Sequence, residues 1–90
     1  MLKTVNIIVE GLVQGVYYRQ STKEKALELG VSGQVRNKSD GTVHIIATGS
    51  QQQIQELIEW CRKGPKRADV TDLKVEEIPT KEFDKFEIVR

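Results

Sequence analysis

The fold is decided by Gly11-Leu12-Val13-Gln14-Gly15-Val16-Tyr17-Tyr18-Arg19-Gln20-Ser21-Thr22, which joins a β-like run to a helical pattern. Before it, Val5, Ile7 and Val9 alternate with polar residues, which predicts a half-buried strand over residues 4–10. Within and after it, apolar or small side chains recur at helical spacing up to about Leu29. The stretch is therefore predicted to form a turn that enters the N-terminus of a helix.

This turn is also a candidate anion site. The first N–H groups of a helix have no intrahelical partner and lie at the positive end of its dipole. A strand, turn and helix in this order can therefore hold a phosphate. Gly15 suits a position that needs positive φ or close approach of a ligand, and Arg19 can offer a planar guanidinium to two phosphate oxygens. The Rossmann and P-loop spacings are absent, so a turn that binds nothing remains the alternative.

The rest of the chain predicts a small α+β domain. A second strand is expected over residues 33–37, an Asp-Gly turn at Asp40, and a third strand over residues 42–48. Ser50 and Gln53 form a capping box, after which Ile54, Leu57, Ile58 and Cys61 lie on one helical face. Residues 70–78 and the pair Phe86 and Ile88 predict two further strands.

The order β-α-β-β-α-β-β predicts a ferredoxin-like α/β sandwich, with both helices on one face of a mostly antiparallel sheet of four to five strands. Ninety residues form one domain, residues 1–90. Fourteen basic and thirteen acidic residues give no strong field that would attract nucleic acid or a membrane surface. The single cysteine and the lack of a signal-peptide pattern lead us to expect a cytoplasmic protein, and we expect a monomer.

Two short motifs carry a resemblance to a known family. Residues 11–19, Gly-Leu-Val-Gln-Gly-Val-Tyr-Tyr-Arg, resemble the G-x-V-Q-G-V-x-[FY]-R signature of acylphosphatases. Residues 33–37 followed by residues 40–43 resemble the second signature of that family, G-[WY]-V-x-N-x-x-D-G-T-V. Gln34 departs from it where an aromatic residue is common, which affects the packing around Asn37 but removes no catalytic group. The family has the same fold and a similar chain length.

The resemblance implies hydrolysis of acyl phosphates to a carboxylate and inorganic phosphate, with no cofactor and no metal. Arg19 and Asn37 would be the catalytic residues, Arg19 on the phosphate and Asn37 on the attacking water. The phosphate would be bound by the turn, consisting of Gln14, Gly15, Val16, Tyr17, Tyr18 and Arg19. Thr42 would either favour the strand or hold the Asn37 amide with its hydroxyl. Inorganic phosphate or sulfate would compete with the substrate.

The sequence also allows other chemistries and other functions. Cys61 and Arg67 have the Cys-x5-Arg spacing of cysteine-dependent phosphatases, but Cys61 completes an apolar helical stripe and is better explained as a buried hydrophobe. His44 is the only histidine, so no His-based metal cluster is expected. Asn37 could bond its own backbone before the turn. A phosphate-binding module without turnover, or an RNA-binding sheet face at Ile8, His44 and Ile46, are the other classes that remain.

Overall fold

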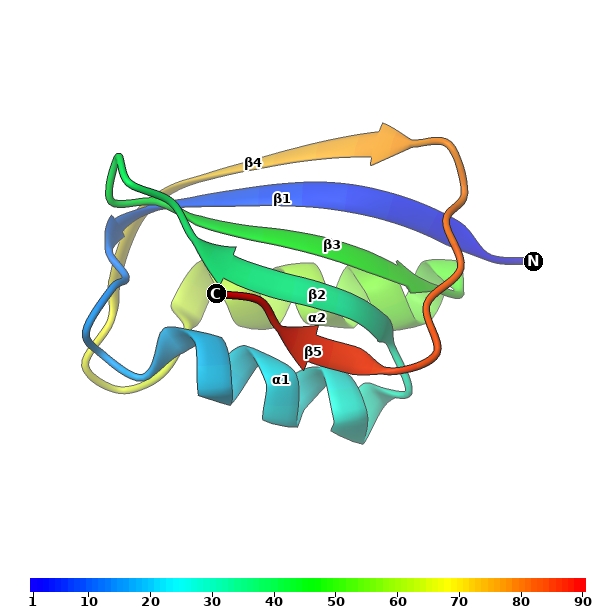
Figure 1. Cartoon of the computed structure of the whole chain (residues 1–90), viewed down its shortest axis with the longest axis horizontal. Helices are drawn as coiled ribbons and strands as arrows, with labels where there is room; N and C mark the ends of the chain where they lie inside the picture. Colours follow the sequence, from blue (N-terminus) through cyan, green and yellow to red (C-terminus); the bar gives the residue numbers. More distant parts are fainter.

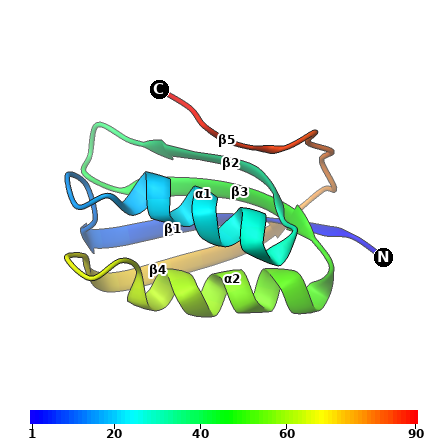
Figure 2. The ribbon, with the colours of Figure 1, turned by 90° about the horizontal axis from the view of Figure 1, so that it is seen from below.

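The computed structural model describes all 90 residues and contains the predicted elements in the predicted order (Figure 1). The elements are β1 (Lys3–Leu12), α1 (Tyr18–Leu29), β2 (Ser32–Asn37), β3 (Val43–Gly49), α2 (Gln51–Lys63), β4 (Asp69–Ile78) and β5 (Phe86–Ile88). The strands form one sheet in the order β4-β1-β3-β2-β5, in which only β5 and β2 run parallel. Both helices cover the same face of this sheet (Figure 2). The predicted ferredoxin-like α+β fold is confirmed.

The strand bounds differ from the prediction at their ends. β1 is longer than residues 4–10 because it pairs with β4 as far as Leu12, past a bulge between Glu10 and Gly11. β3 begins at Val43, one residue later than predicted, because the backbone N–H of Thr42 donates to Asp40 Oδ1 instead of to a strand. These ends depend on cross-strand partners, which alternation within one strand does not reveal.

The core lies between the sheet and the two helices. Val5, Ile7 and Val9, which alternate in the sequence as predicted, are buried, and so are the alternating residues of β2 and β3: Val35, Val43, Ile45 and Ala47. α1 packs on β2 and β5, while α2 packs on β1, β3 and β4. Burial of this apolar surface supplies the main favourable free energy of folding. Tyr18 joins the two helices, since its hydroxyl donates to the Cys61 carbonyl oxygen at 2.7 Å.

The N-terminus of α2 and the C-terminus of α1 are capped as the local sequence dictates. The capping box of α2 is present in full: Gln53 N donates to Ser50 Oγ, and Ser50 N donates to Gln53 Oε1. α1 ends at Gly30, whose left-handed conformation lets Val31 N donate to the Ala26 carbonyl oxygen at 2.8 Å. These caps satisfy backbone groups that the helices themselves leave unpaired.

The connection from β4 to β5, residues 79–85, lies on the sheet face away from the helices and passes from one sheet edge to the other (Figure 1). The hydroxyl of Thr48 donates to the Lys81 carbonyl oxygen at 2.7 Å, and Lys81 N donates to Thr4 Oγ1. Thr48 alternates with the core residue Ala47 and so lies on this face of the sheet. It is only 3% exposed because the connection covers it.

Gly33 fixes the start of β2 against β3. Its φ is +147°, and a Cβ at this position would lie 1.9 Å from the Ile46 carbonyl oxygen. Only glycine allows this backbone approach. The register that follows pairs Val35 with Ile45 and brings Asn37 to the end of the strand opposite Val43.

Candidate active site

The predicted phosphate turn lies between β1 and α1, at the end of the sheet where the β2–β3 hairpin also lies (Figure 1). Val13 anchors the turn in the core, since it is 1% exposed. Gly15 and Tyr17 are left-handed, with φ of +75° and +70°. A Cβ at Gly15 would meet no atom within 4 Å, so this glycine is required by its conformation and leaves open space above the turn.

The turn presents a set of unpaired N–H donors. No hydrogen bond within the protein uses the backbone N–H of Gln14, Gly15, Val16 or Tyr17. Tyr17 is the N-cap of α1 and makes no side-chain capping bond, and the first bond of the helix runs from Ser21 N to Tyr17 O. The first turn of α1 contains no acidic residue. Free donors and an uncompensated helix N-terminus together favour an anion at this place.

Arg19 lies in the first turn of α1, half-buried, and lines a pocket of about 370 Å³. The eight lining residues are Val13, Gly15, Tyr17, Tyr18, Arg19, Gln20, Ile88 and Arg90. None of them is acidic, and Arg19 forms no ion pair with a carboxylate. Its guanidinium is therefore free to pair with an anionic ligand in this pocket.

Asn37 is the last residue of β2, and its side-chain amide carries an unusual feature. Its Oδ1 atom is buried and has no hydrogen-bond partner in the protein. Buried polar atoms are almost always paired, and an unpaired one costs about 1–3 kcal/mol. The local self-bonding that asparagine often makes before a turn is therefore not formed by Oδ1. The Asn37 side chain therefore has a hydrogen-bond acceptor that the protein itself leaves unused.

Gln14 connects the turn to the hairpin that follows Asn37. Its Nε2 atom donates to the carbonyl oxygens of Lys38 at 2.7 Å and of Thr42 at 2.9 Å. The side chain of Gln14 thus bridges the two sequence motifs, while its backbone N–H remains free for a ligand. Neither hydrogen bond could be read from the sequence, because the partners lie 24 and 28 residues away.

Thr42 does not contact the Asn37 amide, which corrects one of the two roles expected for it. Its hydroxyl donates to Asp40 Oδ1 at 2.6 Å, and its backbone N–H donates to the same oxygen. These two bonds lower the pKa of the Asp40 carboxyl from its ordinary value. Thr42 therefore holds the hairpin turn, and any effect on Asn37 passes through the backbone.

The two adjacent tyrosines have different environments. Tyr18 is buried, packs against Trp60 with ring centroids 5.6 Å apart, and contributes to the core. Tyr17 is 69% exposed and lines the pocket with its ring at the surface. Core packing therefore explains Tyr18 but not Tyr17.

The alternative chemistries find no support in the geometry. Cys61 is fully buried, and burial raises the pKa of its thiol to about 12, so it is not a thiolate near neutral pH. His44 is half-buried on the open sheet face, where desolvation, Lys38 and Arg36 outweigh Asp40 and lower its pKa. No three His, Cys, Asp or Glu side chains come together in a metal-binding arrangement. Neither helix combines the length and apolar character needed to cross a membrane.

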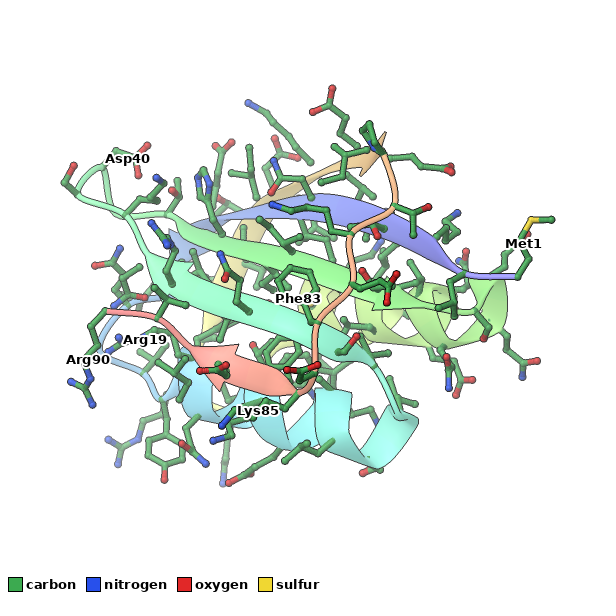
Figure 3. All side chains as sticks on the ribbon, turned by 45° about the vertical axis from the view of Figure 1, so that its right-hand side comes forward. Met1, Arg19, Asp40, Phe83, Lys85 and Arg90 are labelled. Atoms are coloured by element: carbon green, nitrogen blue, oxygen red, sulfur yellow. The ribbon has the colours of Figure 1, made fainter.

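Two residues that no sequence motif marked also line the pocket. Ile88 and Arg90 come from the end of β5 and line the same space as Gly15 and Arg19. Figure 3 shows Arg90 and Arg19 at the same end of the molecule. They are separated by most of the chain, and no motif marked them. Ile88 and Arg90 reach the pocket because β5 pairs with β2 in the folded sheet, and this pairing cannot be read from the sequence.

The sheet with two helices on one face, and the turn of free N–H donors at its end, define a ferredoxin-like domain with an open anion-binding geometry. The family model described as Acylphosphatase matches residues 5–88. The chain belongs to the acylphosphatase family and is a hydrolase of acyl phosphates. The resemblance stated from the two motifs is thereby confirmed.

Individual relatives agree with this. An acylphosphatase of Marinobacter nauticus is 51% identical over 82 residues, which cover 90% of this chain and 89% of that protein. The crystal structure of the Bacillus subtilis acylphosphatase has a TM-score of 0.94 and 36% identity, with all of both chains covered. The Coxiella burnetii acylphosphatase has a TM-score of 0.95 and 36% identity, covering 98% of this chain and 93% of that one.

Proposed function

We propose that the enzyme hydrolyses acyl phosphates by direct in-line attack of a water molecule on phosphorus, with no covalent intermediate. The observation that carries this proposal is the unpaired, buried Oδ1 of Asn37 at the end of β2, next to the hairpin that Gln14 ties to the turn. An amide oxygen can accept a hydrogen bond from water and so fix its position. It is a poor base, so the role is orientation rather than proton abstraction.

The turn and Arg19 bind the phosphoryl group in this proposal. The N–H groups of residues 14–19 and the Arg19 guanidinium donate to its non-bridging oxygens. Phosphoryl transfer through a loose transition state requires chiefly positioning and charge stabilisation, which such donors supply. Gln14 supports both sides, because its side chain ties the turn to the hairpin next to Asn37.

The reaction balances with water as the only co-reactant. The water oxygen forms a bond to phosphorus, and the phosphorus–oxygen bond to the acyl group breaks with its electron pair leaving on the carboxylate. One water proton passes to a phosphate oxygen. A carboxylate is already a good leaving group, so no strong general acid is needed. No cofactor or metal enters this scheme, and the expectation that none is needed is tested by dialysis against a chelator followed by addition of Mg²⁺ or Zn²⁺.

An isotope experiment tests the site of attack. Benzoyl phosphate is hydrolysed in ¹⁸O-water, and both products are examined by mass spectrometry. The label should enter inorganic phosphate and not benzoate. The wild-type enzyme should accelerate this incorporation, and the Arg19→Ala variant should not. Label in benzoate would show attack at the carbonyl carbon and would contradict the roles given to Arg19 and Asn37.

Product inhibition gives a second test. Inorganic phosphate, and sulfate as its mimic, should inhibit competitively by binding at the turn. The affinity should be on the order of millimolar, because a few hydrogen bonds must offset the cost of association. Purely non-competitive inhibition would place the anion elsewhere.

We further propose a cytoplasmic monomer, supported by the single unpaired cysteine and by exposed large apolar side chains that belong to several different elements.

A further inference from the structure

The pocket at the turn has a second guanidinium in its wall. Arg19 enters from α1, and Arg90 enters from the residues that follow β5. Figure 3 shows both side chains at this end of the molecule. Ile88, two residues before Arg90, lines the same pocket with its apolar side chain.

Backbone pairing fixes the place of Arg90. β5 runs parallel to β2 with Gly33 opposite Phe86 and Val35 opposite Ile88. The pairing continues past the end of β5, since Val89 N donates to the Val35 carbonyl oxygen at 2.8 Å. The chain therefore follows β2 up to the residue before Arg90, and Arg90 lines the pocket together with Arg19.

Neither guanidinium in the pocket forms an ion pair with an acidic side chain. All three ion pairs of the molecule use lysines, and no acidic side chain lines the pocket. In the proposed reaction, Arg19 pairs with the phosphoryl group and Arg90 is left without an anionic partner. At about 370 Å³ the pocket falls within the usual range of small-molecule sites, about 300–1,000 Å³, and leaves room for an acyl group beside the phosphate.

We propose that Arg90 is a specificity-determining residue that favours acyl phosphates whose acyl part carries a second anionic group. A carboxylate or phosphate at the far end of the acyl part would pair with Arg90, and a short apolar spacer would pack against Ile88. The proposal rests on the proposed function, which places the phosphoryl group at Arg19. Since Arg90 is exposed at the pocket mouth, the attraction is modest and depends on salt.

Two substrates that differ by one carboxylate test this directly: benzoyl phosphate and 4-carboxybenzoyl phosphate. The measured quantity is kcat/KM for each, and the readout is their ratio in wild type, Arg90→Gln and Arg90→Lys. Arg90→Gln should reduce the preference for the carboxylated substrate by about three- to fivefold, the scale of one exposed ion pair. Arg90→Lys should retain most of the preference, and added salt should weaken it in wild type.

Arg67→Gln is the matched control, because Arg67 is exposed in the α2–β4 connection and does not line the pocket. It removes the same charge and should leave the ratio unchanged. An equal fall for both substrates in Arg90→Gln, or no change for either, would overturn the proposal. Failure of the proposed function would be visible separately, as ¹⁸O label in benzoate or non-competitive phosphate inhibition in the wild type.

Discussion

The side-chain amide of Gln14 lies 2.7 Å from the carbonyl oxygen of Lys38, and this hydrogen bond joins the two halves of the candidate active site. Lys38 directly follows Asn37, while Gln14 directly precedes Gly15 in the turn. A second bond from the same amide reaches the Thr42 carbonyl oxygen at 2.9 Å. The donors proposed to hold the phosphoryl group and the acceptor proposed to hold the water are thus connected through one side chain.

Gln14→Met should therefore impair activity more than stability. Methionine has a similar length but no donor, so both bonds are lost and the unfolding free energy should fall by about 1–2 kcal/mol. Turnover should fall at least about tenfold, because small misplacements of reacting groups are costly. Urea denaturation and kcat/KM with benzoyl phosphate measure the two effects. Gln55→Met, at an exposed position of α2, is the control. Unchanged kcat/KM in Gln14→Met would exclude this coupling role.

Arg19→Ala should lose phosphate binding and turnover together, because the proposed role of Arg19 is to bind the phosphoryl group both before and during the reaction. The loss in kcat/KM should be about a thousandfold or more, as for other arginines that stabilise phosphoryl transfer. Arg19→Lys should restore little, since a point charge does not reproduce the planar fork. Calorimetric titration with phosphate and steady-state kinetics are compared after circular dichroism confirms folding. An active Arg19→Ala enzyme would rule out this assignment.

Asn37→Ala should separate binding from turnover. Phosphate affinity should stay close to that of the wild type, while turnover falls by roughly a hundredfold or more, about 3 kcal/mol, the scale of losing one positioned polar group. The unfolding free energy should not fall and can rise, because the substitution removes a buried oxygen without a partner. Asn6→Ala, on the open sheet face, is the control and should leave turnover intact. Loss of phosphate binding with unchanged turnover would contradict the role.

Thr42→Ala should act on the hairpin turn rather than on Asn37 directly. Removal of the hydroxyl takes away the largest cause of the lowered Asp40 pKa, so the pKa of that carboxyl should rise toward its ordinary value. NMR titration of the Asp40 carboxyl measures this change. Turnover should fall, but less than in Asn37→Ala, since the backbone bond from Thr42 N to Asp40 remains. A fall as large as that of Asn37→Ala would mean that Thr42 acts on the reaction itself.

Cys61 should influence alkaline stability and not catalysis. Burial raises the pKa of its thiol to about 12 in the folded protein, from 9.0 in an unstructured chain. Above pH 9 the unfolded state releases a proton that the folded state keeps, so stability falls as pH rises from 9 toward 12. Burial raises the pKa of Tyr18 as well, which adds to this fall above pH 10.

The comparison of wild type with Cys61→Ala isolates the contribution of the thiol. Between pH 8 and pH 10 the wild-type unfolding free energy should decline by about 1.4 kcal/mol more than that of the variant. Urea denaturation at pH 8, 9 and 10 measures both slopes, which are compared instead of absolute stabilities because alanine leaves a cavity. The variant should hydrolyse benzoyl phosphate at pH 7. An inactive but folded Cys61→Ala enzyme would revive the cysteine-phosphatase reading.

The sequence by itself determined the elements, their order and most of the core. The alternation of Val5, Ile7 and Val9 and the capping box of Ser50 and Gln53 can be read from the sequence, because both patterns depend only on neighbours along the chain. The Asp40–Gly41 turn predicted the hairpin in the same way. The strand–turn–helix order around Gly15 indicated only a candidate anion site, and the family resemblance of the two motifs singled out Arg19 and Asn37.

Only the tertiary structure decided what surrounds those residues. Gln14 reaches Lys38, Thr42 turns to Asp40, and Thr48 lies under Lys81 because the chain brings distant segments together in one register. Arg90 enters the pocket because β5 returns parallel to β2 at the sheet edge. Local periodicity contains no information on such pairings, since side-chain hydrogen bonds and strand register are settled by packing across the whole sheet.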